Sequence, residues 1–369
     1  MLFIGLISGT SVDGIDAALV RCNEPAAPEL IAGITEPYPK SLSQRLKTAM
    51  HSTSIDYAEL CELDTAVAEA FAVAALKLSA QRPENEQIVA IGSHGQTLFH
   101  HPTATHPNSL QIGNPSVIAQ RTGIDTVADF RRADIARGGQ GAPLLPALHQ
   151  RLFGHATTTR AVLNLGGIAN ITVLPAGSAA PSFGFDTGPA NTLLDAWVLH
   201  WLGEPLDEDA RWSQGGQVVS TILDTLLADP YFAKQPPKST GVEYFNMAWL
   251  RQAVPSLEQH DARDVARTLV LVSALSAANA VNATDARELY AVGGGAHNPL
   301  MMSDLKAHCR AQVRPAHAAG VDVDYLEAMA FAWFARCYLD GHAAMSPTVT
   351  GASQPVVLGG LYPGGLLVD

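Results

Sequence analysis

The first half of the chain alternates short apolar runs with longer patterns of helical spacing. The short runs, bounded by turn residues, predict strands at about 3–7, 15–22, 31–38, 87–92 and 125–128. Apolar residues three and four apart predict helices at about 41–51 and 57–78, and an Asn-Pro start predicts another from Asn114. Strands that alternate with helices are typical of an α/β fold.

The second half repeats this alternation. Apolar runs predict a strand pair over 161–174 and a strand at 289–293. Helical spacing predicts helices at about 189–202, 215–228, 261–281, 298–307 and 323–339. The tail from Pro347 to Asp369 is rich in Gly and Pro, and we expect it to pack back on the first half.

Length and composition narrow the class of protein. With 369 residues the chain exceeds the roughly 250–300 at which one core stops growing, so we expect two domains, 1–135 and 136–369. The net charge is −12 and Lys and Arg do not cluster, which argues against a nucleic-acid partner. No apolar run is long enough for a membrane span, and four scattered cysteines suggest free thiols, so we expect a cytoplasmic protein.

A strand–turn–strand element occurs twice. Residues 5–20 read GLISGTSVDGIDAALV and residues 161–174 read AVLNLGGIANITVL, each hinged on glycines. Such turns can aim successive N–H groups at phosphate oxygens. A third glycine cluster, YAVGGGAHNP at 290–299, could close the nucleoside end. Two similar half-domains that face each other over a nucleotide make phosphoryl transfer the leading interpretation, although an ordinary hairpin explains the first turn equally well.

The first turn also carries metal-type ligands. Asp13 and Asp16 offer oxygens of the kind that Mg²⁺ prefers, usually through water. No GKS or GKT follows, so this is not a Walker motif.

Asp186, in GFDTGPAN, is the candidate general base. We predict that it lies just before a helix, with Pro189 in the first turn and Thr187 or Gly188 as cap, so that the helix dipole keeps it ionised. A carboxylate fixed on a sharp turn can activate a hydroxyl or water. The alternative is an Asp that only satisfies backbone donors.

Further polar residues could contact a substrate. Arg131, in DFRRAD, suits a carboxylate or phosphate, with a surface ion-pair cluster as the alternative. His94 and Gln96 follow a buried strand, where His94 either bonds a substrate hydroxyl or is structural. Glu327 is an acid in an apolar helix and needs a ligand or an ion pair.

Taken together, these segments resemble the anhydro-N-acetylmuramic acid kinases. The similar motifs run in order from residue 5 to about 352: GLISGTSVDGIDAALV, IGSHGQT, DFRRADIARGGQGAPL, LNLGGIANIT, GFDTGPAN, PPKSTGVEYFN and VGGGAHNP. The resemblance implies two ribonuclease-H-like (actin-like ATPase) domains with ATP and substrate in a cleft between them. It implies that ATP and water convert 1,6-anhydro-N-acetylmuramic acid to N-acetylmuramic acid 6-phosphate, in recycling of cell-wall peptidoglycan, and that the protein is a homodimer.

The resemblance also implies roles for individual residues. Asp186 matches the base that activates water, and Arg131 and Glu327 fall where the family contacts sugar, to which we add His94 and Gln96. The residues expected to bind ATP are Gly9, Thr10, Ser11, Val12, Asp13, Gly14, Ile15, Asp16, Gly166, Gly167, Gly293, Gly294 and Gly295. Ala190 departs from the family, where Gly is frequent, but a helix tolerates Ala.

Two other functions remain open on these residues. One is a kinase of the same architecture for another sugar, in which Asp186 deprotonates a hydroxyl. The other is an Hsp70-like or actin-like ATPase, although the chain has no room for a peptide-binding domain after it. A non-catalytic nucleotide-binding module fits less well, because both turns, both acids and the base are present.

Overall fold

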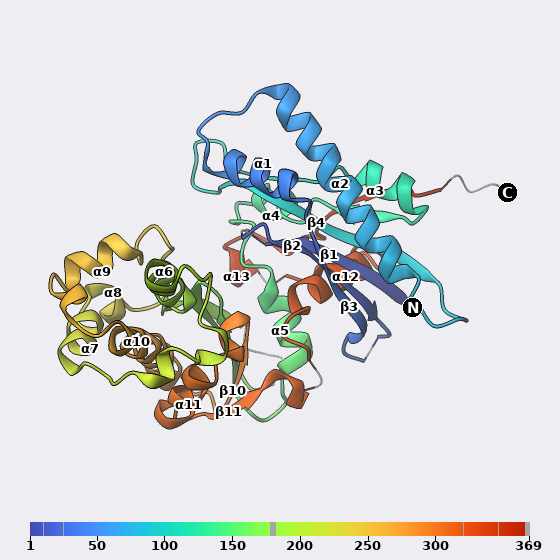
Figure 1. Ribbon diagram of the computed structural model, residues 1–369. Helices are drawn as coiled ribbons and strands as arrows, with labels where there is room; N and C mark the ends of the chain where they lie inside the picture. Colours follow the sequence, from blue (N-terminus) through green and yellow to red (C-terminus); the bar gives the residue numbers. More distant parts are fainter. Residues whose placement is uncertain (10, 25, 178–181, 320, 346, 366–369) are drawn as a thin grey trace. The chain divides into compact units, whose positions relative to one another are not determined.

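The computed structural model describes residues 1–9, 11–24, 26–177, 182–319, 321–345 and 347–365, and the chain forms two compact units (Figure 1). Unit 1 comprises Met1–Leu152 and Tyr325–Asp369, and unit 2 comprises Phe153–Asp324. The expected domains divided instead at residue 135, and only the tail from Pro347 was expected to return to the first half. The difference has a packing cause, because a helix and a strand near the end of the chain complete the sheet of unit 1.

The sheet of unit 1 has seven strands among the described residues. In chain order they are β1 (Leu2–Ser8), β2 (Gly14–Arg21), β3 (Glu29–Pro37), β4 (Ile88–His101), β5 (Asn108–Ile112), β6 (Thr126–Ala128) and β12 (Gly360–Tyr362). The order is β12-β6-β4-β1-β2-β3, with β5 paired to β4. Strands β1, β2 and β3 are antiparallel, whereas β4 runs parallel to β1 and β6 runs parallel to β4.

Helices cover both faces of this sheet (Figure 1). They are α1 (Lys40–His51), α2 (Tyr57–Ser79), α3 (Pro115–Thr122), α4 (Arg132–Ile135), α5 (Leu145–Phe153), α12 (Leu326–Leu339) and α13 (Pro347–Thr350). Phe71 of α2 belongs to the same core cluster as Ile4 and Leu6 of β1. Because strand side chains alternate between faces, Gly5 belongs to the opposite face, where α12 packs.

Helix α12 approaches this second face closely because glycines lie beneath it. A Cβ on Gly5 would collide with the carbonyl oxygen of Ala328, and one on Gly92 would collide with that of Phe331. Strand β12 then pairs antiparallel with β6 at the sheet edge. Both contacts place the end of the chain in unit 1, including the helix predicted at 323–339 for the second domain.

The sheet of unit 2 repeats the topology of unit 1. Its strands are β7 (Arg160–Leu165), β8 (Ile168–Leu174), β9 (Phe183–Pro189), β10 (Glu288–Val292) and β11 (Gln312–Pro315). The order β11-β10-β7-β8-β9 matches β6-β4-β1-β2-β3, and so do the strand directions. The predicted fold class, α/β with two ribonuclease-H-like domains, is therefore confirmed.

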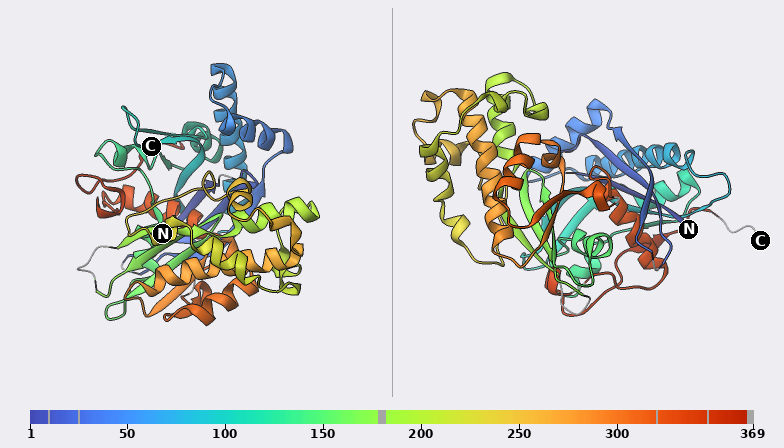
Figure 2. Two further views of the ribbon diagram at one scale, coloured as in Figure 1. Left: turned by 90° about the vertical axis from the view of Figure 1, so that its left-hand side faces the viewer. Right: turned by 90° about the horizontal axis from the view of Figure 1, so that it is seen from below.

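The helices of unit 2 pack together against its sheet (Figure 2). They are α6 (Asn191–Leu202), α7 (Ser220–Leu227), α8 (Pro230–Ala233), α9 (Met247–Ala253), α10 (Ala262–Asn282) and α11 (Pro299–His308), with a short 3₁₀ turn, η4 (Gly294–His297). Helix α10 is long and apolar enough to cross a membrane by composition, but 72% of that stretch is buried inside the protein. It is the central helix of the core of unit 2.

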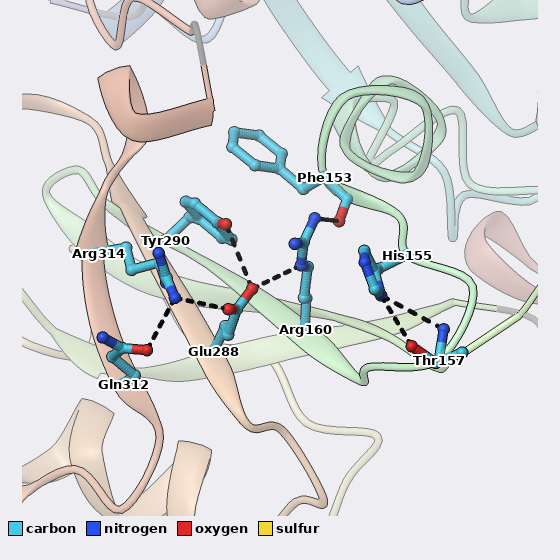
Figure 3. A network of polar contacts seen from close by, with 8 residues as sticks. All are labelled: Phe153, His155, Thr157, Arg160, Glu288, Tyr290, Gln312 and Arg314. Carbon is cyan, nitrogen blue, oxygen red and sulfur yellow. Dashed lines mark hydrogen bonds and ion pairs between the residues drawn. The ribbon is translucent and has the colours of Figure 1, made fainter.

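Ion pairs tie the amino ends of the parallel strands of unit 2 together (Figure 3). The Glu288 carboxylate on β10 accepts from Arg160 Nε on β7 at 2.7 Å and lies 2.9 Å from Arg314 Nη2 on β11. Tyr290 donates its hydroxyl to the same carboxylate at 3.3 Å, and Arg160 also donates to the carbonyl of Phe153. Charged side chains thus pair across the strands at this end of the sheet, whereas glycine loops follow the strands at the opposite end.

Candidate active site

The predicted site residues collect at the carboxyl ends of parallel strands in each unit. In unit 1 the turn from Gly9 follows β1, His94 lies in β4 between Ser93 and Gln96, which pair with the carboxyl end of β1, and Arg131 follows β6. In unit 2 Gly166 follows β7 and Gly293 follows β10. Loops at this edge of an α/β sheet are where ligands generally bind. The topology therefore brings the predicted residues of each unit to one edge of its sheet.

The turn between β1 and β2 is braced from two sides. Val12 donates its N–H to the carbonyl of Gly9 at 3.2 Å and has a left-handed φ of 57°, which is uncommon for a β-branched residue. Its side chain is fully buried in the core of unit 1, which holds this conformation in place. Gln96 donates to the carbonyl of Gly9 at 3.2 Å, and the Ser43 hydroxyl donates to that of Val12 at 2.8 Å.

The other turn residues differ in what they expose. Ser11 and Asp13 are exposed, whereas Ile15 is buried, so Val12 and Ile15 offer only their main chain to a ligand. Gly14 begins β2, and Thr10 lies outside the described residues. Gln96 is buried, and no donor among the described residues reaches its Oε1.

The two acids of this turn lie in different settings. Asp13 Oδ1 lies 3.6 Å from Lys47 Nζ, while Asp16, half-buried on β2, accepts from the Thr35 hydroxyl at 2.7 Å. Within the described residues, no group of three or more His, Cys, Asp or Glu could hold a metal ion. Beside Asp13 is an open recess of about 720 Å³, whose lining is Asp13, Pro37, Tyr38, Lys40, Ser43, Gln44, Lys47, Thr48 and His51.

His94 orients Arg131. Arg131 donates from Nε to His94 Nε2 at 2.9 Å and from Nη1 to the carbonyl of Gly141 at 2.6 Å. Because a guanidinium only donates, His94 Nε2 must accept, so its proton is on Nδ1, which lies 3.0 Å from the carbonyl of Gly95. Burial, together with the charge of Arg131, lowers the pKa of His94 to about 3. Of the two predicted roles for His94, these contacts match the structural one.

Arg131 and Glu327 are coupled electrostatically. Burial lowers the pKa of Arg131 to about 10, and the carboxylate of Glu327 opposes that shift. Glu327, in the first turn of α12, has a solvent-accessible side chain, yet the surrounding protein raises the pKa of its carboxyl by desolvation. The charge of Asp16 adds to this shift and that of Arg131 opposes it. The charges of Asp16 and Arg131 therefore both act on Glu327 within unit 1, in opposite directions.

Asp186 lies in strand β9, and the prediction that it lies just before a helix whose first turn contains Pro189 is wrong. It pairs with Asn170 of β8, and Pro189 ends the strand. Helix α6 begins only at Asn191, after Ala190, and no side chain caps it. Strand pairing of 183–189 with β8 overrode the cap signal of Thr187 and Pro189, because Thr187 is buried and donates to the carbonyl of Ala169. The argument from the helix dipole therefore does not apply.

A loop outside the strand holds the Asp186 carboxylate. Thr240 donates its N–H to Asp186 Oδ2 at 3.0 Å, and Tyr231 donates its hydroxyl to the carbonyl of Asp186 at 2.7 Å. Asp186 is half-buried, and desolvation raises the pKa of its carboxyl, with the Thr240 amide opposing the shift and Glu243 adding to it. The sequence segment PPKSTGVEYFN contains Thr240 and Glu243, but its polar pattern did not identify them as site residues.

The glycine turns of unit 2 meet at the start of α6. The carbonyls of Gly166 and Gly167 accept from the amides of Asn191 and Ala190, at 3.0 and 2.9 Å. Gly293, with φ of 79°, leaves no room for a Cβ beside the Asn164 side chain, and Gly295 packs against Leu165. The side chain of Asn191 donates to the carbonyl of Leu165 at 3.0 Å.

The structure thus brings the five predicted glycines of unit 2 together, namely Gly166, Gly167, Gly293, Gly294 and Gly295. It adds Asn164 and Asn191 to them. Sequence reasoning missed both, although each stands inside a motif used for the resemblance, LNLGG and GPAN.

Solved structures similar to this chain share little sequence with it. An activator of the 2-hydroxyisocaproyl-CoA dehydratase from Clostridium difficile with bound ADPNP is 13% identical, with 91% of this chain and 94% of that chain covered and a TM-score of 0.46. A ROK family glucokinase from Streptomyces griseus, in complex with glucose and AMPPNP, is 15% identical. The match covers 91% of this chain and 99% of the glucokinase chain, with a TM-score of 0.40.

A family model gives the identity. The model described as anhydro-N-acetylmuramic acid kinase matches residues 1–364, nearly the whole chain. The match includes the braced turn of unit 1, Asp186 on β9 and the glycine turns of unit 2. The resemblance seen in the motifs is confirmed: the chain belongs to the anhydro-N-acetylmuramic acid kinase family.

Proposed function

We propose that Asp186 is the general base of this kinase and that it activates water for attack on the anhydro sugar. The protein is a phosphotransferase that acts on anhydro-N-acetylmuramic acid and uses ATP. The observation that carries the proposal is the setting of Asp186: a half-buried carboxylate, held at Oδ2 by one backbone N–H, with a raised pKa. A base that is desolvated and fixed in this way is suited to take a proton near neutral pH.

The proposed reaction begins with water and ends with transfer of the γ-phosphoryl group of ATP. Asp186 takes a proton from water while the water oxygen forms a bond to the anomeric carbon. The bond from that carbon to the bridging oxygen breaks, and the released oxygen attacks the γ-phosphorus of ATP. The bond between the γ-phosphorus and the oxygen that bridges to the β-phosphate then breaks. The products are N-acetylmuramic acid 6-phosphate and ADP, with one proton left on Asp186.

Residues of unit 1 would position the substrates. The turn Gly9–Asp16 would hold phosphate oxygens with its main chain, and Arg131, fixed by His94 and Gly141, would present its remaining N–H groups to the sugar's carboxylate. Gln96, Glu327 and His94 would complete this side, with His94 acting through Arg131. In unit 2 the glycines 166, 167 and 293–295 would accept the nucleotide by close approach of their backbone.

The acids of the turn fit a hard cation. Asp13 and Asp16 supply carboxylate oxygens, and two such groups suit an ion that keeps most of its water, as Mg²⁺ does. When bound, Mg²⁺ would neutralise charge on the phosphates during transfer. The family resemblance further suggests a cytoplasmic homodimer, which sedimentation of the purified protein would test.

The test compares wild type with Asp186→Asn. ADP release is measured with and without 1,6-anhydro-N-acetylmuramic acid, in ¹⁸O-labelled water. Wild type should release ADP only with the sugar and place the label on the anomeric oxygen. Asp186→Asn should lower kcat by about a hundredfold or more and leave the KM for ATP nearly unchanged. Asp224→Asn, an exposed change on α7, is the matched control. Turnover of Asp186→Asn close to wild type would remove Asp186 from the mechanism.

A further inference from the structure

The segment from Lys238 to Glu243 runs beside β9 at Asp186. Asp186 donates its own N–H to the carbonyl of Lys238 at 3.2 Å, and two residues later Thr240 donates its N–H to Asp186 Oδ2 at 3.0 Å. One short piece of main chain therefore holds both the backbone and the carboxylate of Asp186. Strand β8 pairs with β9 on its other side, with Asn170 opposite Asp186.

The near end of this segment is anchored by Lys238. Its ammonium donates to the carbonyls of Tyr231 and Phe232, both at 3.4 Å, and lies 4.7 Å from the centroid of the Tyr231 ring. Tyr231 is itself buried, and its hydroxyl donates to the carbonyl of Asp186 at 2.7 Å. Lys238, Tyr231 and Asp186 therefore form one connected set of contacts, so a shift of the segment would also move the base.

The far end of the segment is anchored by aromatic packing. Phe245 has no exposed surface, and its ring centroid lies 5.4 Å from that of Tyr231 and 4.9 Å from that of Trp249. Such ring pairs stabilise a fold beyond the burial of their apolar surface. With Lys238 and Phe245 both fixed, the residues between them have little freedom to move.

Within the described residues, the hydrogen bond to the Asp186 carboxylate goes to Oδ2. The other oxygen, Oδ1, is left to accept a proton. Between the two anchors, the Glu243 carboxylate folds back over Gly241, where a Cβ would meet it. The segment thus places a donor, the Thr240 amide, on the Asp186 carboxylate, and it carries a second negative charge, the exposed Glu243, three residues further on.

We propose that the segment Lys238–Glu243 is a positioning element for Asp186, in which the Thr240 amide and the Glu243 carboxylate act on the base in opposite directions. This inference rests on the proposed role of Asp186 as general base. Thr240 and Glu243 are positioning residues, because they act on the substrate only through Asp186. The amide stabilises the ionised base and fixes Oδ2. Glu243 keeps the base from becoming too weak a proton acceptor.

The charges around Asp186 agree with these directions. Desolvation raises the pKa of Asp186, the Thr240 amide lowers it, and Glu243 raises it. The phenol of Tyr231 also faces Asp186, whose charge adds to the rise in the pKa of that phenol. The Lys238 ammonium lies over the Tyr231 ring, and Lys234 contributes to lowering the pKa of Lys238.

The experiment follows kcat/KM for 1,6-anhydro-N-acetylmuramic acid from pH 5 to 8.5 in the full-length enzyme. Thr240→Pro removes the N–H that stabilises the ionised carboxylate. The acid limb, which is the low-pH part of the profile where kcat/KM falls as Asp186 becomes protonated, should therefore move up by about one pH unit. Glu243→Gln removes the negative charge, so the limb should move down by about a few tenths of a unit. Thr240→Ala keeps the amide and should keep the limb of wild type. Glu258→Gln, which removes a carboxylate of unit 2 that pairs with Arg251 and does not contribute to the shifted pKa of Asp186, is the charge control.

Opposite shifts from two residues of one segment would support the inference, since loss of folded structure alone would not produce them. Limbs that coincide with wild type in both Thr240→Pro and Glu243→Gln would overturn it. Where circular dichroism shows that Thr240→Pro is unfolded, Glu243→Gln decides alone: a downward shift supports the inference and an unchanged limb refutes it. Asp186→Asn separates the two proposals. An active Asp186→Asn enzyme refutes the role of Asp186 as base. An inactive Asp186→Asn enzyme, together with unmoved acid limbs in Thr240→Pro and Glu243→Gln, refutes only the positioning.

Discussion

Acid should destabilise unit 1 through His94, and the change His94→Gln should remove that sensitivity. His94 is 6% exposed, and its Nε2 must accept the N–H of Arg131, so the folded protein keeps the ring neutral. Burial beside Arg131 lowers its pKa from the usual 6.5 to about 3. Glutamine can still accept from Arg131 through its amide oxygen, but it cannot titrate.

The direction and size of the effect follow from linkage. Between pH 6.5 and 3 the unfolded chain binds a proton at His94 that the folded chain does not, so stability falls as the pH falls. The full contribution is present above about pH 7, and below about pH 3 no more is lost. At pH 5.0, which is 1.5 units below 6.5, the loss is about 2 kcal/mol at 1.36 kcal/mol per unit.

The assay is urea unfolding at pH 7.5 and pH 5.0 for wild type and His94→Gln. Trp333 is the one tryptophan of the sequence inside unit 1, so ¹⁹F NMR of protein labelled with 5-fluorotryptophan separates this unit from unit 2. His149 is also buried with its pKa lowered to about 3, but it is present in both proteins and cancels. Wild type should lose about 2 kcal/mol more than His94→Gln on going to pH 5.0. Equal losses of the free energy of unfolding in the two proteins would refute the conclusion that His94 is neutral and accepts a hydrogen bond from Arg131.

Two further predictions concern packing and buried charge. Gly92→Ala should destabilise the protein by about 1–3 kcal/mol in urea unfolding, because its Cβ would collide with the carbonyl of Phe331. Gly360→Ala, which faces open space, should change stability by less than about 0.5 kcal/mol, and equal effects would contradict the close approach of α12. Asp304→Asn should lower stability by about 3–5 kcal/mol in thermal unfolding, because Arg267, which now donates to both oxygens of a 12% exposed carboxylate at 2.8 and 2.9 Å, would lose the opposing charge and one of its two acceptors. Glu208→Gln, in the exposed pair with Arg211, should cost less than about 1 kcal/mol, and a comparable loss would show that burial is not the cause.

Local patterns predicted most of the elements, because each is specified by residues close in sequence. The apolar stripe with Leu63 and Phe71 predicts α2, which the structure places at Tyr57–Ser79. The Asn-Pro start predicts α3, where the Asn114 side chain caps the helix through the amide of Ser116. The duplicated strand–turn–strand element predicts two similar half-domains, and the two sheets do share one order of strands.

The remaining features depend on contacts between distant parts of the chain. Asp186 was misplaced because pairing with Asn170 decides its conformation, and nothing near GFDTG in the sequence shows that pairing. The role of His94 depends on Arg131, 37 residues away, and the support of Asp186 comes from Thr240, 54 residues away. The membership of α12 in unit 1 depends on Gly5 and Gly92, whose missing side chains give no apolar signal.

The return of α12 to unit 1 has a consequence for how the protein is made. Unit 2 is one continuous stretch, Phe153–Asp324, and its last residue is synthesised before the first residue of α12. The sheet that contains the N-terminus keeps one face open until then, with the apolar surface around Gly5 and Gly92 exposed to solvent. The ribosome therefore completes unit 2 first, and unit 1 can complete its fold only after the segment from Tyr325 has been synthesised. A nonsense mutation just before Tyr325 would leave unit 2 whole and disable the unit made first, which makes that incomplete sheet a natural target for chaperones and proteases.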